Sequence, residues 1–254
     1  MTITFLGTGT SQGVPVVACN CHVCSSSDNK DKRLRSSILV EYESLNVVID
    51  TGPDFRYQML RENVQRLDAV LFTHEHKDHI AGLDDIRAFN YKQQSSLPIY
   101  ATGRVIDALK REFHYVFSDQ KYPGIPQVHL HEINSQPFTI GGKLGIIPIE
   151  VMHFKLPVLG YRFGDFTYIT DAKTVPDEEF EKIKGTKILV INALQREKHI
   201  SHFTLQEAIE FAERVGAEHT FLTHISHRLG RYTEVSKELP DGIKLAYDGL
   251  KLSL

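Results

Sequence analysis

Residues 69–79 read Ala69-Val-Leu-Phe-Thr-His-Glu-His-Lys-Asp-His79, an apolar run that leads directly into three histidines and an aspartate. The run predicts a short buried strand, and the polar residues that follow form an HxHxDH motif. Side chains just past a strand end are often functional, because the strand fixes the backbone while the loop turns them inward. The motif therefore predicts a metal site, and a histidine-rich surface turn is the alternative interpretation. The predicted ligands are His74, His76, Asp78 and His79.

Three further candidate ligands follow later apolar, strand-like runs: His153, Asp171 and His224. Each alone is compatible with a hydrogen-bonded turn residue, but the repetition favours a shared metal centre. Four ligands would not hold two metals, whereas the larger set would. Imidazole and carboxylate ligands suit zinc, manganese or iron better than magnesium or calcium, so we expect two divalent metals of the first group.

The rest of the chain alternates between strand-like and helical patterns. Strands are predicted at 3–6, 38–42, 47–49, 69–73, 98–100, 128–131, 145–151, 161–163, 166–170, 187–191, 220–223 and 243–246. Helices are predicted at 55–64, 80–91, 105–117, 177–183 and 205–215. Before the last of these, Thr204 and Glu207 have the spacing of a capping box. Because helices are interspersed among more numerous strands, we expect an α+β fold of two mixed β-sheets packed face to face with helices outside.

No linker, repeat or low-complexity tract divides the chain, so we expect one domain over residues 1–254. Hydrophobic residues make up 41% of the sequence, which is ordinary for a protein with a full core. Residues 19–35 are rich in Ser, Asn, Asp and Lys and predict a long loop that a metal clip would order.

The overall charge excludes some partners. Lys and Arg total 29 against 32 for Asp and Glu, a net charge of −3, so no charge excess would attract a phosphate backbone. We therefore do not expect a nucleic-acid substrate. The amino terminus lacks a basic and apolar leader, and no apolar run approaches the roughly 18 residues of a membrane span. We expect a cytoplasmic protein without a membrane partner.

The histidine and aspartate pattern resembles the metallo-β-lactamase superfamily, whose fold is an αββα sandwich. The resemblance implies one metal held by His74, His76 and His153, and another held by Asp78, His79 and His224, with Asp171 bridging them. Asp50, in Val47-Val-Ile-Asp-Thr-Gly52, resembles the aspartate that orients a ligand histidine in this superfamily.

A narrower resemblance extends along most of the chain, through residues 7–15, 19–24, 223–227 and 247–249. Together these are similar to the phosphoribosyl cyclic phosphate phosphodiesterases and their relatives. The resemblance implies a structural zinc held by Cys19, Cys21, Cys24 and His227, which needs no oxidising compartment. A labile disulfide, three free thiols, or His22 in place of His227 are the alternatives.

Two metals about 3.5–4 Å apart would bridge a water and supply hydroxide at neutral pH. We therefore expect a hydrolase, with Asp78 taking part in catalysis. The narrower resemblance implies that its substrate is a small or cyclic phosphodiester. By resemblance, His202 assists departure of the leaving group or binds phosphate; a plain helix-terminus residue is the alternative. Arg87 would bind the phosphate, unless it is a solvent-exposed helix arginine.

Other functions share parts of this pattern. A thioester or lactone hydrolase could use the same hydroxide on a carbonyl. An RNA-processing nuclease would need a basic face or an RNA-gripping arm, and neither stands out. A flavodiiron oxidoreductase would carry a carboxylate where His76 stands, and a non-catalytic metal-binding module would lack a ligand. We expect a small-molecule substrate, and a homodimer is compatible with the sequence.

Overall fold

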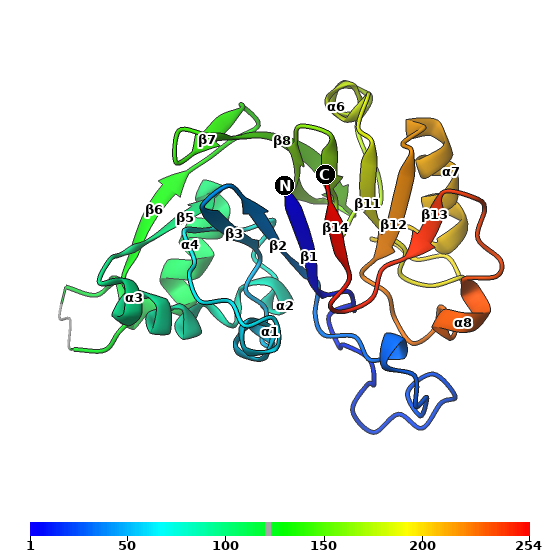
Figure 1. Cartoon of the computed structure of the whole chain (residues 1–254), viewed down its shortest axis with the longest axis horizontal. Coiled ribbons are helices and arrows are strands. Elements are labelled where there is room, and N and C mark those ends of the chain that lie inside the picture. Colours follow the sequence, from blue (N-terminus) through cyan, green and yellow to red (C-terminus); the bar gives the residue numbers. More distant parts are fainter. Residues whose placement is uncertain (120–122) are drawn as a thin grey trace. The chain divides into compact units, whose positions relative to one another are not determined.

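The computed structural model describes residues 1–119 and 123–254 (Figure 1). The chain forms two compact units, each containing one seven-stranded sheet. Unit 1 comprises Met1–Leu6, Ser37–Asn134 and Lys251–Leu254, and unit 2 comprises Gly7–Ser36 and Ser135–Leu250. Both sheets contain parallel and antiparallel pairs, and helices pack on them, so the predicted α+β class with two mixed sheets is confirmed. One domain over the whole chain stays a prediction.

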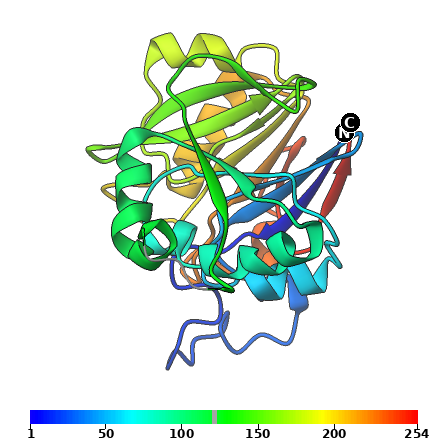
Figure 2. The same ribbon diagram turned by 90° about the vertical axis from the view of Figure 1, so that its left-hand side faces the viewer.

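The sheet of unit 1 has the strand order β14-β1-β2-β3-β4-β5-β6. Its strands are β1 (Thr2–Gly7), β2 (Ser37–Tyr42), β3 (Leu45–Ile49), β4 (Ala69–Leu71), β5 (Leu97–Ala101), β6 (Val128–Glu132) and β14 (Lys251–Ser253). Strands β3 to β6 are parallel, so the loops that follow them leave the same edge of the sheet. The two termini lie side by side, as Figure 2 shows, because β14 pairs antiparallel with β1.

Apolar side chains of this sheet pack against helices. The helices of unit 1 are α1 (Phe55–Arg61), α2 (Lys77–Ile80), the 3-10 helix η2 (Leu83–Ile86), α3 (Arg87–Gln93), α4 (Gly103–Glu112) and α5 (His114–Phe117). Val48, Val70 and Ile99 from the strands share a buried core with Phe55 and Leu109 from the helices. This core supports the loops that carry the HxHxDH motif.

The predicted helix 80–91 is wrong in its continuity, because the chain turns at Gly82 between α2 and η2. The backbone N–H of Gly82 donates to the Thr51 carbonyl at 2.8 Å. A Cβ at residue 82 would lie 2.2 Å from the carbonyl oxygen of Gly52, so only glycine allows this close approach. The predicted helix 105–117 is likewise divided at Phe113, whose φ of −116° is not helical.

The sheet of unit 2 has the strand order β13-β12-β11-β10-β9-β8-β7. Its strands are β7 (Phe138–Ile140), β8 (Leu144–His153), β9 (Leu156–Phe163), β10 (Phe166–Tyr168), β11 (Ile188–Asn192), β12 (His219–Thr223) and β13 (Ile243–Leu245). Strands β8 and β9 form a hairpin longer than predicted, because their backbone pairing continues to the tight turn after His153. Strands β10 to β13 are parallel, which places the ends of β10 and β12 on either side of β11.

The helices of unit 2 are η1 (Asn29–Asp31), α6 (Asp177–Ile183), α7 (Leu205–Val215) and α8 (Tyr232–Val235). Helix α7 lies along one face of the sheet (Figure 1), where Ala208 and Phe211 share a core with Leu189 and Leu222. The predicted capping box is confirmed: Thr204 Oγ1 accepts from the Glu207 N–H, and the Glu207 carboxylate accepts from the Thr204 N–H. Within the described residues, no helix is long and apolar enough to cross a membrane.

Candidate metal centre

The HxHxDH motif forms a tight cluster of imidazoles at the end of β4. His74 and His79 are fully buried, and their ring centroids are 4.2 Å apart. The ring centroid of His76 lies 4.6 Å from that of His74, and His76 directly precedes α2. The carboxylate of Asp78 lies 3.1 Å from Nε2 of His79. The structure thus brings together the four ligands predicted from this stretch.

Asp50 supports this cluster from the neighbouring strand end. Its carboxylate accepts hydrogen bonds from the Thr73 N–H and hydroxyl, each at 2.8 Å, and from Nδ1 of His79 at 2.7 Å. Burial raises the pKa of the Asp50 carboxyl, whereas His79 and Thr73 favour its ionised form. A histidine that donates through Nδ1 presents Nε2 as a ligand, which is the orienting role expected for Asp50.

In unit 2, the later predicted ligands also lie at strand ends. His153 is the last residue of β8, Asp171 lies just beyond β10, and His224 directly follows β12. His224 Nε2 lies 3.2 Å from Oδ1 of Asp171, and both side chains are buried. The Asn192 side chain of β11 accepts a hydrogen bond from the Ala172 N–H at 2.7 Å and donates one to the Ala172 carbonyl at 2.9 Å. These two bonds hold the loop that carries Asp171.

Left-handed backbone marks several of these positions. Asp50, Asp171 and His224 have φ angles of 64°, 57° and 54°. Such angles are uncommon for residues other than glycine, and they concentrate at functional sites. Each of these residues lies just beyond a strand of its sheet.

His224 is held by three hydroxyls that the sequence did not single out. Thr10 Oγ1 lies 3.2 Å from its Nε2, while Ser36 and Thr170 Oγ lie 3.2 Å and 3.4 Å from its Nδ1. Of the three, only Thr170 had a sequence signal, because it directly precedes the predicted ligand Asp171.

His202 lies within the same cluster of unit 2. Its Nε2 is 3.1 Å from Oδ1 of Asp171, and its ring stacks on His224 with centroids 5.0 Å apart. The ligand atoms of His153, Asp171 and His202 all lie within 4.8 Å of one another. His199, for which the sequence predicted no role, lies with its Nδ1 3.1 Å from Nδ1 of His202. Its only sequence signal was the HxxH spacing with His202.

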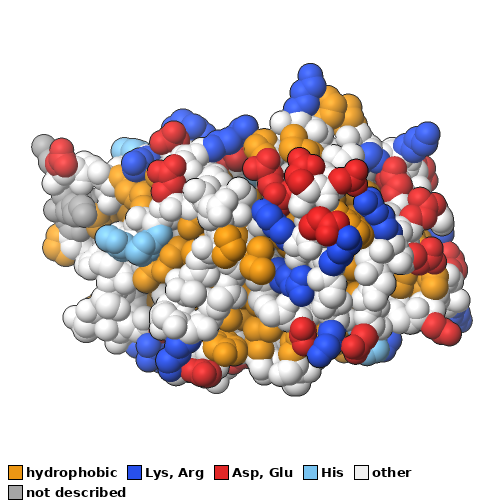
Figure 3. Space-filling model, turned by 90° about the horizontal axis from the view of Figure 1, so that it is seen from above, with side chains coloured by type: hydrophobic (Ala, Val, Ile, Leu, Met, Phe, Trp, Pro, Cys, Tyr) orange, Lys and Arg blue, Asp and Glu red, His pale blue; other side chains and the backbone are white. Residues whose placement is uncertain are grey.

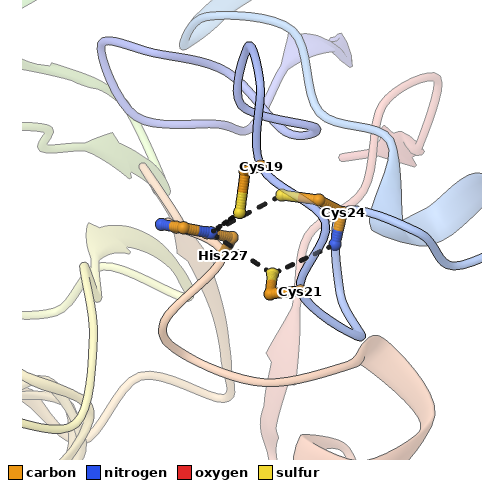
Figure 4. A group of neighbouring side chains, drawn as sticks. All are labelled: Cys19, Cys21, Cys24 and His227. Carbon is orange, nitrogen blue, oxygen red and sulfur yellow. Dashed lines mark hydrogen bonds between the residues drawn. The ribbon is translucent and has the colours of Figure 1, made fainter.

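The three cysteines and His227 form a compact set (Figure 4). His227 Nδ1 lies 3.3 Å, 3.4 Å and 3.5 Å from the sulfurs of Cys19, Cys21 and Cys24. A tetrahedral zinc with Zn–S near 2.3 Å would place its ligands about 3.6 Å apart, so the four donors fit such an ion. The cysteines are not joined by a disulfide, and His22 lies instead beside Glu234, with 61% of its side chain exposed.

The thiols of this set differ in acidity. A hydrogen bond from the Cys24 backbone lowers the pKa of Cys21 to about 6, whereas burial raises that of Cys24 to about 11. Cys21 is therefore the more acidic of these two thiols.

Arg87 lies on the surface of unit 1. Its guanidinium is 3.3 Å from the carboxylate of Asp84, one helical turn away, and 55% of its side chain is exposed. Arg104 and Lys77 form further ion pairs near the motif, with Glu75 and Glu112. These contacts show that Arg87 is already paired, and a role in binding phosphate stays a prediction.

The family model described as the beta-lactamase superfamily domain matches residues 45–225. An octanoyltransferase from Porphyromonas gingivalis is 41% identical over 254 residues, covering 99% of this chain and 51% of that protein. The chain thus spans about half the length of this relative. Ribonuclease Z from Pyrobaculum islandicum is 25% identical over 258 residues, covering 84% of this chain and 88% of that protein.

A solved structure described as a new diphosphatase from the PhnP family is 42% identical, with a TM-score of 0.93. The match covers 100% of this chain and 97% of the other. The chain belongs to the metallo-β-lactamase superfamily. Within that superfamily, it resembles the PhnP-family diphosphatase over its whole length. The superfamily fold implies divalent metal ions, which the histidine and aspartate clusters fit.

Proposed function

We propose that the protein is a phosphodiesterase that hydrolyses small phosphodiesters, including cyclic ones. The observation that carries this proposal is the 42% identity, over the whole chain, to a protein described as a diphosphatase. The relationship to ribonuclease Z supports it as well, since a ribonuclease also cleaves a phosphorus–oxygen bond.

The proposed active site follows the ligand pattern of the superfamily. One metal would be held by His74, His76 and His153, the other by Asp78, His79 and His224, with Asp171 shared. Zinc or manganese, or iron, suits this donor set. Such metals would supply Lewis acidity toward the phosphate oxygens and lower the pKa of a bound water.

The protein's own side chains would orient the metal ligands and protonate the leaving group. Asp50 would hold His79 so that Nε2 faces the proposed metal, and the 2.7 Å hydrogen bond from His79 Nδ1 to Asp50 supports this role. His202 would give a proton to the departing alkoxide, because an imidazole can hold and release a proton near neutral pH. Arg87 would reach a phosphate only by leaving Asp84, so we assign it a secondary part in binding.

Acyl chemistry is the first alternative, and the octanoyltransferase name is compatible with it. That name belongs to a protein about twice as long as the matched region, so we give it less weight than the full-length match. RNA cleavage is the second alternative. Figure 3 shows basic and acidic side chains interspersed over the face it draws, and the net charge is −3, which supports a small substrate.

The test is a parallel assay of purified protein with its metals counted by elemental analysis. The substrates are a ribose cyclic phosphate, a nucleoside diphosphate sugar, bis(4-nitrophenyl) phosphate, an octanoyl thioester and a precursor tRNA. We expect turnover of small phosphorus esters. His76→Ala should reduce it at least about 100-fold, the upper end for residues that only orient a ligand. The matched control is His219→Ala, at the exposed start of β12. Thioester or tRNA turnover without turnover of the small phosphorus esters would contradict the proposal.

A further inference from the structure

His199 is a half-buried histidine in the segment between β11 and α7 that has no part in the proposed ligand set. Its ring centroid lies 5.0 Å from that of His202, and the two Nδ1 atoms are 3.1 Å apart. Its neighbours Lys198 and Ile200 are exposed, so the chain turns His199 inward while the flanking residues face solvent. His199 is therefore placed for its contact with His202 and not for packing in the apolar core.

Ser201 connects this pair to the predicted metal ligands of unit 2. Its hydroxyl lies 3.3 Å from Nδ1 of His199 and 3.2 Å from Nδ1 of His202. Its backbone N–H donates to Nδ1 of His199 at 3.4 Å, and its carbonyl accepts from Nδ1 of His153 at 2.8 Å. Residues 199–202 thus contact both the predicted ligand His153 and the candidate catalytic residue His202.

The orientation of the His202 ring depends on what contacts Nδ1. An imidazole can rotate by about 180° about its χ2 torsion, which exchanges each ring nitrogen with a carbon position. In the observed orientation Nε2 faces Asp171 at 3.1 Å, whereas the rotated ring would present carbon there. Polar partners at both ring nitrogens favour the observed orientation: Asp171 at Nε2, and His199 and Ser201 at Nδ1.

We propose that His199 is a positioning residue for His202, which fixes the ring so that Nε2 faces Asp171 and the reacting centre. This inference rests on the proposed function for its kinetic test, but not for its spectroscopic test. His199 itself touches neither substrate nor metal in this assignment. It acts through His202, so its loss should affect proton donation and leave substrate binding intact.

The kinetic test compares two phosphodiesters that differ in their leaving group. An alkoxide needs a proton to depart, whereas 4-nitrophenolate does not. We expect His199→Leu to lower kcat about 10–100-fold on the alkyl ester, with little change in KM and little effect on the nitrophenyl ester. His199→Asn, whose amide lies near the former Nδ1 position, should restore most of the rate. The matched control is His219→Leu, the same change at an exposed histidine of unit 2.

The spectroscopic test follows the ring nitrogens of His202 by NMR in zinc-loaded protein. We expect one set of ¹⁵N signals in the wild type and in His199→Asn, and exchange between two ring states in His199→Leu. An unchanged His202 spectrum in His199→Leu would overturn the inference, as would equal rate losses on both esters or loss of bound metal. If the wild type hydrolyses no phosphodiester, the proposed function fails, and the NMR comparison still decides the role of His199.

Discussion

The buried carboxylate of Asp50 illustrates how single residues determine this site. Asp50 lies in a left-handed turn after β3, and the described partners of its carboxylate come from the segment after β4. Burying a charge is costly unless donors surround it, and the Thr73 and His79 groups provide that compensation. The same contacts fix the ring of a predicted metal ligand, so stability and function depend on one side chain.

Asp50→Asn should therefore weaken metal binding. Oδ1 accepts from the Thr73 N–H, and Oδ2 accepts from the Thr73 hydroxyl and from Nδ1 of His79. An amide replaces one of these oxygens by an NH₂ group and removes the negative charge, so one set of donors loses its acceptor. We expect metal affinity to fall about 10–100-fold, as for other residues that orient a ligand. Competition with a chromophoric chelator measures this affinity. Asp107→Asn, at an exposed position of α4, is the control, and an affinity equal to that of the wild type would show that Asp50 does not orient His79.

At the scale of elements, α7 begins where its sequence predicts, because its capping interactions are local. Thr204 and Glu207 satisfy each other's backbone N–H groups, and Lys173 Nζ contacts both carboxylate oxygens of Glu207, at 2.7 Å and 2.9 Å. This start follows the segment that carries His199 and His202. The cap thus fixes one end of the segment that contacts the predicted metal ligands His153 and Asp171.

Glu207→Gln tests the charge of this cap. Burial raises the pKa of Glu207, but Lys173 and Thr204 outweigh it, so the net pKa is lowered. Its ionised form therefore stabilises the fold above the ordinary Glu pKa of about 4.3, and this contribution is lost as pH falls through the lowered value. We expect Glu207→Gln to lower the free energy of unfolding by about 0.2–1 kcal/mol at pH 7. Urea unfolding should show the difference shrinking toward pH 3, and a constant difference would refute the charge argument.

At the scale of the whole molecule, the Cys-His set ties segments distant in sequence. His227 lies 203 residues beyond Cys24, yet its Nδ1 is 3.5 Å from that sulfur. His224, a predicted ligand of the other metal centre, is three residues before His227 on the loop after β12. Metal bound by the cysteines would order residues 19–35 and brace this loop at the same time.

Removal of zinc should release the 19–35 loop. After chelation we expect a lower Tm and faster trypsin cleavage within residues 30–35, where four basic residues occur, because the loop loses its cross-link. Limited proteolysis with mass spectrometry measures this. Zn²⁺ should restore protection and Mn²⁺ should not, since thiolates favour zinc. Cys21→Ser should be cleaved rapidly even with Zn²⁺ present, and unchanged cleavage after chelation would exclude a structural zinc.

Much of the architecture could be predicted, because strand burial and helix capping depend on neighbouring residues. The break at Gly82 was not predicted, since it depends on the approach of Gly52 from another segment. His199 was overlooked for a similar reason: it follows no strand, and only folding places it 3.1 Å from His202. Arg87 was predicted to bind phosphate, but its pairing with Asp84 became evident only with side chains in place.

The sequence by itself determined the HxHxDH cluster, because four donors within six residues meet wherever the chain turns after β4. It also determined that the candidate metal ligands follow buried strands, because local runs of hydrophobic residues specify those strands. Only the tertiary structure decided which distant donors become neighbours. Asp171 and His224 are 3.2 Å apart because β10 and β12 flank β11 in one parallel sheet, an order that depends on long-range pairing and packing.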